Sequence, residues 1–523
     1  MSNFRLSAWT ASGLGLAFVL SAAQAAHAQL DYTIGPSVEG ASLNSENTAF
    51  GAQAIPPDTS IAVGTFDVIS YVNGRYLTFT KNGTLEQSQT DRSFWANNLQ
   101  TGDHLSDTRQ IFDAASGRYF VSAVSIPGSG AANAFLLGVS KTDNILDGFN
   151  TYKIDAYANG GSNFADYTQM GVNGNGIYLS SNNFDTSTSP ITYSNTNQVL
   201  AIDKAALLNG TVSSSLFTTS EDTNGFTSHP ITDLDGGTGP EGVLSDSSTS
   251  FQYTSNYLLS SVNKTATGFS YTDAGPGINN GTFYNGPNQA DQKGTAKLID
   301  SGDTRLSGDV IQRNGKIYSI QTVADPTSGK SDLHYAIFDA ATKTLITDGL
   351  ISDPNLNYYY GSLSVNKFGD IVVGMSGSGA PAGTFGGQYA SAYSVVGKFD
   401  GTTAKFGSAF VIQQGLGKYE TTSDPNPNST TSSVRWGDWS QTTVDPNDPY
   451  SFWTAQEYAT GVTLAQATAT KPVVDQWAVR LVNINLTPVP ETSTFVSGGA
   501  GFLGLGLLLL TARKRRRQSG SAE

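Results

Sequence analysis

A unit of two short strands recurs along this chain and constrains its fold more than any other feature of the sequence. Each copy opens on a small or acidic residue, usually Asp, and continues into a short alternating strand. A turn rich in Gly or Asn follows, and then a second strand rich in aromatic residues. Six copies begin at Asp58, Asp107, Asp166, Asp303, Gly361 and Asp438. The long interval between Asp166 and Asp303 predicts one further copy, which we assign to residues 235–257.

Seven such units predict an all-β protein, and specifically a seven-bladed β-propeller. Most copies start 49 to 77 residues apart, which suits one four-stranded sheet per copy. A hairpin of this kind buries one face only by packing on the next, so closure of the ring stabilises every unit. Two tandem β-sandwiches are the alternative, but they would not explain the repeat. Helical periodicity is nearly absent, and a short helix is expected only within residues 198–208.

The N-terminus predicts a signal peptide over residues 1–28. A basic residue precedes an apolar run at 14–20, which is too short to span a bilayer, and the segment ends in Ala26-His27-Ala28. That ending is typical of a signal-peptidase site, so we expect export through the inner membrane. Residues 29–487 then form the propeller domain.

The C-terminus, residues 488–523, has three parts in a fixed order. Pro490-Glu491 comes first, an uncharged stretch at 495–512 follows, and a basic cluster stands at 513–517. The stretch is barely long enough to cross a bilayer as a helix, and the basic cluster should stay cytoplasmic. This order resembles the PEP-CTERM sorting signal of Gram-negative bacteria, although that family usually has a second Pro where Thr492 stands. A plain membrane anchor is the alternative.

The resemblance to this sorting signal implies a partner and a destination. An exosortase-type enzyme would remove the tail after the helix has anchored the protein transiently in the membrane. The protein would then reach the cell surface or the extracellular space.

Composition excludes several classes of function. The chain has no cysteine, so thiol catalysis, zinc–thiolate sites and iron–sulfur clusters are excluded. Its formal net charge of −14 disfavours binding to nucleic acid.

The body of the chain resembles a family of secreted bacterial β-propeller proteins that are sialidase-like in architecture and of unassigned function. The resemblance covers residues 56–481 and rests on several motifs: Pro56-Pro57-Asp58-Thr59, Lys81-Asn82-Gly83, Asp107-Thr108-Arg109, Arg435-Trp436-Gly437-Asp438-Trp439, Val444-Asp445-Pro446 and Glu457-Tyr458. A sialidase would show repeated Ser-x-Asp-x-Gly-x-Thr-Trp turns, and none is present, so the resemblance does not imply sialidase activity.

The charged residues at the starts of the repeats are the candidate ligand-binding residues. Because the opening strand of a blade usually lines the central channel, these side chains should ring one mouth of it: Asp58, Asp107, Arg109, Asp166, Asp303, Arg305, Arg435 and Asp438. A structural role is the alternative, since Asp caps turns and Arg links neighbouring blades. Recurrence in nearly every unit favours that role. On this interpretation, replacing Asp107 or Asp303 by Ala should lower stability by similar amounts.

No cofactor and no metal ligand set is predicted from the sequence. The run 233–237 has the alternating oxygen ligands of a calcium loop, but position twelve is Leu244 rather than Glu. An irregular structural calcium site and a simple turn both remain open there. The Trp and Tyr residues fall on strand positions and are expected in the core.

Two functions fit these observations. The first is a non-enzymatic binding or scaffolding protein of the cell envelope or the extracellular polysaccharide matrix. The second is an extracellular glycan hydrolase that uses carboxylates at the channel mouth. No catalytic residue is assigned, because the fold alone does not decide between the two.

Overall fold

The computed structural model describes most of the predicted propeller domain. The described residues are 30–43, 45, 54–128, 133–157, 163–189, 191–246, 253–380, 387–420, 433–461 and 476–488. The predicted signal peptide at 1–28 lies outside them. So do Pro490, Glu491, the stretch at 495–512 and the basic cluster. Among the described residues, no helix has both the length and the apolar content needed to cross a bilayer.

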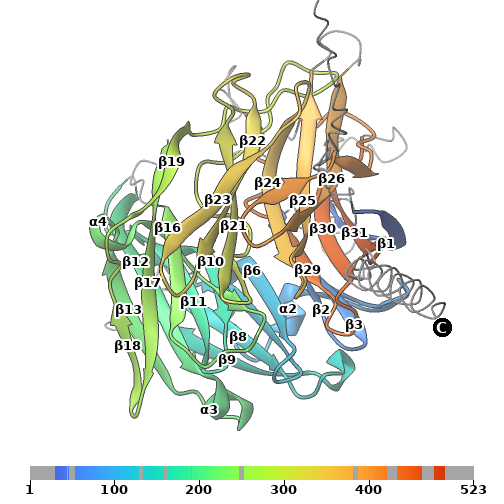
Figure 1. The fold of residues 1–523 in the computed structure, drawn as a ribbon. Coiled ribbons are helices and arrows are strands. Elements are labelled where there is room, and N and C mark those ends of the chain that lie inside the picture. Colours follow the sequence, from blue (N-terminus) through green and yellow to red (C-terminus); the bar gives the residue numbers. More distant parts are fainter. Residues whose placement is uncertain are drawn as a thin grey trace, which may run out of the picture.

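The described chain is an all-β protein with a propeller arrangement (Figure 1). Two of its sheets are four-stranded meanders. Their strands are β2 (Ser60–Val63), β3 (Asp67–Val72), β4 (Arg75–Thr80) and β5 (Leu85–Thr90), then β6 (His104–Asp113), β7 (Arg118–Ile126), β8 (Ala134–Ser140) and β9 (Phe149–Asp155).

Two further sheets have five strands each. One contains β14 (Phe226–Pro230), β16 (Glu241–Asp246), β17 (Tyr253–Thr265), β18 (Gly268–Thr272) and β19 (Ile278–Asn285). The other contains β24 (Asn357–Val365), β25 (Asp370–Gly379), β26 (Gln388–Phe399), β27 (Ala404–Phe406) and β28 (Phe410–Gln413).

The largest sheet has nine strands and consists of two antiparallel meanders. The first is β10 (Asn163–Val172), β11 (Gly176–Asp185), β12 (Thr192–Asp203) and β13 (Ser214–Ser220). The second is β20 (Ile311–Arg313), β21 (Lys316–Ala324), β22 (Ser331–Asp339) and β23 (Thr344–Ile351). The two-residue strand β15 (Thr232–Asp233) joins them through parallel pairs with β10 and β20.

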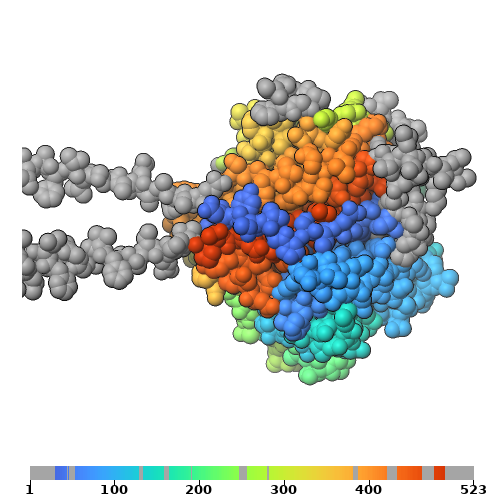
Figure 2. Space-filling model, turned by 90° about the vertical axis from the view of Figure 1, so that its right-hand side faces the viewer, coloured from blue at the N-terminus to red at the C-terminus, as the bar shows by residue number. Residues whose placement is uncertain are grey.

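The last sheet unites the two ends of the domain. It contains β29 (Gln441–Val444), β30 (Ser451–Ala459) and β31 (Trp477–Leu486), and its fourth strand is the N-terminal β1 (Tyr32–Ser42). Strand β1 pairs antiparallel with β31, from Tyr32 opposite Leu486 to Ser42 opposite Ala478. Figure 2 shows the N-terminal segment lying against C-terminal segments on this face.

The innermost strands follow one another around the centre. Strand β6 contacts β2 and β10, and β10 contacts β14. On the other side, β24 contacts β21 and β29, and β29 contacts β2. Between these two groups the contact runs through an outer strand: β19, which pairs with β17, contacts β21 and β23 and completes the ring. The propeller arrangement therefore follows from contacts between sheets as well as from the pairing within them.

A β-bulge interrupts the innermost strand at the same place in four units. In each case two residues face one on the partner strand, and the first of the two has a positive φ. These residues are Asp107 (φ 59), Tyr167 (φ 59), Thr227 (φ 54) and Tyr360 (φ 49). Such a conformation is uncommon for residues other than Gly, and bulges often redirect side chains beside functional sites. The bulges bring the residues of these four units to one mouth of the channel.

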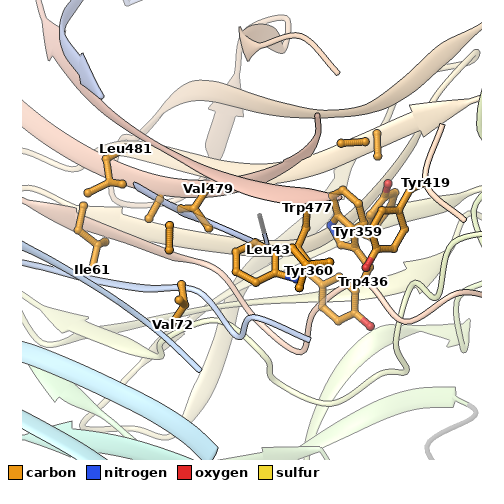
Figure 3. Close-up of a cluster of buried hydrophobic side chains, with 14 of the residues drawn as sticks. Leu43, Ile61, Val72, Tyr359, Tyr360, Tyr419, Trp436, Trp477, Val479 and Leu481 are labelled. Carbon is orange, nitrogen blue, oxygen red and sulfur yellow. The ribbon is translucent and has the colours of Figure 1, made fainter. Parts of the chain in front are cut away.

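The aromatic side chains form the core, as the sequence predicts. Figure 3 shows the rings of Tyr359, Tyr360, Tyr419 and Trp436 close to Trp477. All of them are at most 5% exposed. Three further aromatic residues are buried as well: Tyr358, Trp439 and Trp453.

The short helix expected within residues 198–208 is present as α3 (Lys204–Leu208): residues 198–203 continue β12, and Asp203 caps the helix by accepting from the Ala206 N–H. It is not the only described helix, and two further local expectations were wrong. The missing unit begins at β14 rather than at residue 235, and it opens on Thr227 instead of an Asp. Residues 303–307 form no strand, since that unit starts its ladder only at β20. The other described helices are short: α2 (Asp91–Phe94), η1 (Ile145–Asp147) and α4 (Glu221–Asn224).

Candidate functional site

A polar cavity of about 330 Å³ lies at the mouth marked by the bulges. Its walls come from β10, β24 and the segments that precede β20 and β29. Five of the eight candidate residues line it: Asp166, Asp303, Arg305, Arg435 and Asp438. Asp300, Tyr167 and Tyr360 also line it. The other three candidates, Asp58, Asp107 and Arg109, are buried outside its walls.

Both arginines of the cavity are held by carboxylates. Arg305 forms a forked pair with Asp303, through Nε at 2.8 Å and Nη2 at 2.6 Å. Its guanidinium also lies 4.2 Å from the ring centre of Tyr167. Arg435 contacts Asp438 at 2.7 Å and Asp300 at 3.4 Å. Because paired side chains of this kind keep a fixed orientation, the cavity presents preorganised donors and acceptors.

Asp166 differs from the other carboxyl groups of the cavity wall. Burial raises the pKa of Asp166 to about 7, and the charges of Asp107 and Asp438 act in the same direction. The positive charge of Arg305 opposes them. Near neutral pH this carboxyl group is therefore both a proton donor and a proton acceptor.

Asp58 and Asp107 link neighbouring sheets. The Asp107 carboxylate accepts from the Tyr167 N–H at 2.6 Å and the Thr168 N–H at 3.3 Å, both at the bulge of the next unit. Asp58 accepts from the Asp438 N–H at 2.9 Å. Burial raises the pKa of both carboxyl groups, and so does the charge of Asp438. This geometry matches a structural role for both residues, in which the Asp side chains accept hydrogen bonds from buried backbone N–H groups.

Arg109 lies within the channel rather than at its mouth. Its Nε donates to the Thr168 carbonyl at 3.1 Å, and its Nη2 donates to the Ser307 carbonyl at 3.2 Å. Its Nη1 lies 3.6 Å from Asp309, and its guanidinium stacks 3.8 Å from the Trp439 ring centre. Gln441 donates to the same Asp309 carboxylate at 2.5 Å. Polar side chains therefore pack together between the two mouths.

Four residues at this mouth escaped the sequence analysis. Asp300, Tyr167 and Tyr360 line the cavity, and Glu457 is buried close to Asp58, where it accepts from the Thr59 hydroxyl at 3.1 Å. Burial and the charge of Asp58 raise the pKa of Glu457 well above its usual range. Tyr167 and Tyr360 stand at the bulge positions, so an alignment of the repeats on Asp107 is the signal that would have found them.

The opposite mouth has a second cavity, of about 390 Å³, at the other ends of β10 and β29. Its buried carboxylates are already neutralised, Asp113 by Lys204 at 2.5 Å and Asp445 by Lys81 at 2.6 Å. Asp233, from the calcium-like run, accepts from the backbone N–H groups of Asp235 and Gly237 and so closes a turn. Within the described ranges, no group of three or more acidic or His residues is placed to hold a metal ion.

Comparison with known proteins gives similarity of fold only. No family model matches the chain, and no curated protein matches it. A protein of unknown function from Dyadobacter fermentans aligns at 8% identity and a TM-score of 0.39, covering 74% of this chain and 96% of that one. An α-L-arabinofuranosidase from Fusarium graminearum aligns at 9% identity and a TM-score of 0.36, covering 86% and 97%. An arabinanase from Bacillus subtilis aligns at 14% identity and a TM-score of 0.30, covering 56% and 97%.

The structure gives Asp107 and Asp303 different surroundings, so it changes the expectation that their Ala variants lose stability equally. We expect Asp107→Ala to lower the free energy of unfolding by about 1–3 kcal/mol for each of the two donors it leaves unpaired. We expect Asp303→Ala to cost about 1 kcal/mol or less, since the pair it breaks is partly exposed. Thermal melts measure both. Asp107→Asn is the matched control: it keeps an acceptor and should melt closer to the wild type. Equal losses in the two Ala variants would contradict this assignment.

Proposed function

We propose that this protein is an exported propeller that binds a neutral polyhydroxylated ligand, such as the end of an extracellular polysaccharide, in the cavity of about 330 Å³. The observation that carries the proposal is the composition of the wall. It offers carboxylate acceptors, guanidinium donors and the Tyr360 hydroxyl, which is buried without a partner among the described residues. Sugar hydroxyls both donate and accept, so they match such a wall. The volume is in the range of small-ligand sites.

The charge of the cavity supports a neutral ligand. Four Asp side chains and two Arg side chains line it. Each Arg already pairs with Asp, so neither guanidinium charge is left uncompensated for a ligand carboxylate or phosphate. An acidic sugar would meet excess negative charge at short range, which costs binding energy in a partly dehydrated site.

We further propose that the ring has seven blades. The support is the division of the nine-stranded sheet at β15: on either side lies a complete four-stranded meander, β10–β13 and β20–β23. The pairs through β15 are few, and they are parallel, unlike the antiparallel pairs within each meander. Counted as two blades, these meanders join the five remaining sheets. An experimental structure that shows one continuous nine-stranded sheet would contradict this count.

The proposed location is the cell surface or the extracellular space. It rests on the A-x-A ending of the leader and on the order of Pro490-Glu491, the apolar stretch and the basic cluster. In a Gram-negative host with an exosortase, the full chain should pass through the membrane fraction before release. A chain that lacks residues 492–523 should never enter that fraction. If the shortened chain still sediments with membranes, the proposed anchor is wrong.

A glycan array with purified residues 29–487, followed by calorimetry on the best neutral glycan, tests the binding site. Asp303→Asn and Arg435→Gln should each weaken binding roughly 10- to 100-fold, because each removes a charged hydrogen-bonding group from the wall. Asp235→Asn, at the opposite mouth, is the control and should bind normally. Normal binding by both mouth variants would reject this cavity as the site.

Hydrolysis is the second candidate function, and Asp166 is the observation that favours it. A carboxyl group with a pKa of about 7 beside other carboxyl groups is the pattern of a general acid. If the protein is a hydrolase, turnover should fall as the pH rises through about 7, since the acid form is lost. Asp166→Asn should then abolish turnover while binding persists. Unchanged turnover in this variant would exclude Asp166 as the general acid. So would the absence of turnover of any glycan that the protein binds.

A further inference from the structure

A carboxyl group without a hydrogen-bond donor among the described residues is buried at the start of β22, and it lines neither of the two cavities. Asp332 is the second residue of this strand and is 0% exposed. Neither of its carboxyl oxygens has a hydrogen-bond partner in the part of the chain that the structure describes. Because an isolated buried carboxylate is strongly unfavourable, this position needs either a proton or a cation.

A second carboxyl group interacts with it. Asp325 begins the turn between β21 and β22, and its side chain lies within hydrogen-bonding reach of Asp332. The Asp325 carboxylate is held in place by the Thr327 N–H at 2.7 Å and the Ser328 hydroxyl at 2.9 Å. The turn therefore aims one fixed carboxylate at another that has no donor of its own.

Two other charged groups act on this pair. Asp353, in the connection between β23 and β24, adds a third negative charge, and Lys330 supplies a positive one. The Asp353 carboxylate is oriented by the Asn355 N–H at 2.7 Å. Lys330 also lies 4.0 Å from Asp291, so its charge is shared with a further carboxyl group. When the three Asp side chains are ionised, they therefore keep an excess of negative charge that a divalent cation would reduce.

The protonation states agree with this geometry. Burial raises the pKa of Asp332 to about 8, and the charge of Asp325 adds to the effect. Burial also acts to raise the pKa of Asp325, but the hydrogen bonds from Thr327 and Ser328 outweigh it and lower that pKa. Without a cation, the pair would therefore share one proton at neutral pH.

We propose that Asp325 and Asp332 bind a hard divalent cation, with Ca²⁺ as the best match. Both protein ligands are carboxylates, and Ca²⁺ accepts variable numbers of oxygen ligands in irregular geometry, including water and main-chain carbonyls. Mg²⁺ demands a stricter octahedron and gives up its water reluctantly. This site has two direct carboxylate ligands, with Asp353 contributing charge from the neighbouring connection.

Such a cation would join two successive units of the ring. Asp325 and Asp332 belong to the β21–β22 hairpin, and Asp353 leads into β24 of the next sheet (Figure 1). Leu333, beside Asp332, and Tyr358 of β24 pack in one apolar cluster. Binding should therefore stabilise the packing of these two sheets, separately from any ligand at the channel mouth.

Thermal melts of the purified chain in millimolar Ca²⁺ and in chelator test this proposal. Ca²⁺ should raise the melting temperature by a few degrees, because a ligand that binds only the folded state stabilises it. Asp332→Asn, which keeps the shape of the side chain, should lose that shift. Asp339→Asn is the matched control, since Asp339 ends the same strand and caps its own turn. This control variant should keep the full shift.

Terbium(III) luminescence gives a second readout that does not depend on melting. Terbium occupies calcium sites. The charge of Asp332 contributes to raising the pKa of Tyr358, so this tyrosine lies near the proposed site. Excitation of Tyr358 should therefore sensitise the bound ion. Excess Ca²⁺ should quench the emission, and Asp325→Asn should abolish it. Melting that does not respond to Ca²⁺ in the wild type would overturn the proposal in favour of a shared proton. A calcium shift that survives in Asp332→Asn would overturn it as well.

Discussion

Arg109→Leu should destabilise the protein by about 3–5 kcal/mol, because it leaves one partner of a buried ion pair without compensation. The substitution removes the guanidinium from Asp309, two hydrogen bonds to backbone carbonyls and the stacking on Trp439. Asp309 keeps only the Gln441 amide as a described donor. Chemical denaturation of wild type and variant measures the difference.

The pH dependence of this loss has a definite sign. Burial already raises the pKa of Asp309, and Arg109 opposes that effect. Without Arg109, the pKa of Asp309 in the folded protein rises further above its value in the unfolded chain. The free energy of unfolding therefore falls as the pH increases from the unfolded-state pKa to the folded-state pKa. The difference in free energy of unfolding between the wild type and Arg109→Leu should therefore be smaller near pH 4 than near pH 8.

Two further variants make this prediction specific. Adding Asp309→Asn to Arg109→Leu should recover part of the loss, since it removes the uncompensated charge. Arg118→Leu is the control in the neighbouring strand, because Arg118 is half-buried and, among the described residues, its side chain donates to carbonyls of its own turn. Its effect should stay within about 0.5 kcal/mol. A deficit that is independent of pH, or that the double variant does not reduce, would contradict the assigned role of Arg109.

Removal of strand β1 should have the second large effect. A mature chain that begins at residue 43 loses the partner of β31, from Tyr32 to Ser42. Strand β31 then becomes an open edge, and Val479 and Leu481 lose part of their cover. We expect the shortened protein to melt at least ten degrees lower and to aggregate, since the ring no longer closes between its two ends.

Complementation separates loss of closure from general damage. A synthetic peptide of residues 30–43, added to the shortened protein, should raise its melting temperature and reduce aggregation. A peptide of the same composition in scrambled order should do neither. If the shortened protein melts like the wild type, closure by β1 does not stabilise the ring.

The repeat in the sequence predicted the propeller because strands and turns are local features. Alternating side chains and Gly-Asn turns identify each hairpin without knowledge of its neighbours. The same reasoning placed the start of the fourth unit at residue 235 instead of at β14, since no Asp marks the opening strand Phe226–Pro230. It also missed β1, because nothing in residues 32–42 indicates a partner at the other end of the domain.

The candidate site was predicted less well than the fold. Asp107 and Asp303 share the sequence Asp-Thr-Arg, yet one is buried between sheets and the other pairs with Arg305 in a cavity wall. The difference arises from neighbours distant in sequence, since Tyr167 and Thr168 supply the donors to Asp107. The carboxyl group of Asp332 gave no signal at all, because burial without a donor is a property of the folded chain.

The pairing of β1 with β31 also determines how the domain responds to mechanical load. Tyr32 lies opposite Leu486, and the Thr487 N–H donates to the Asp31 carbonyl at 2.8 Å. The chain therefore enters the described domain at Asp31 and leaves it at Thr487 side by side. Force applied between these two ends would peel the closing strands apart one residue pair at a time, instead of shearing many hydrogen bonds together. If the protein is anchored only through its C-terminal tail, no force acts between β1 and β31. Such an anchor therefore leaves the ring closed.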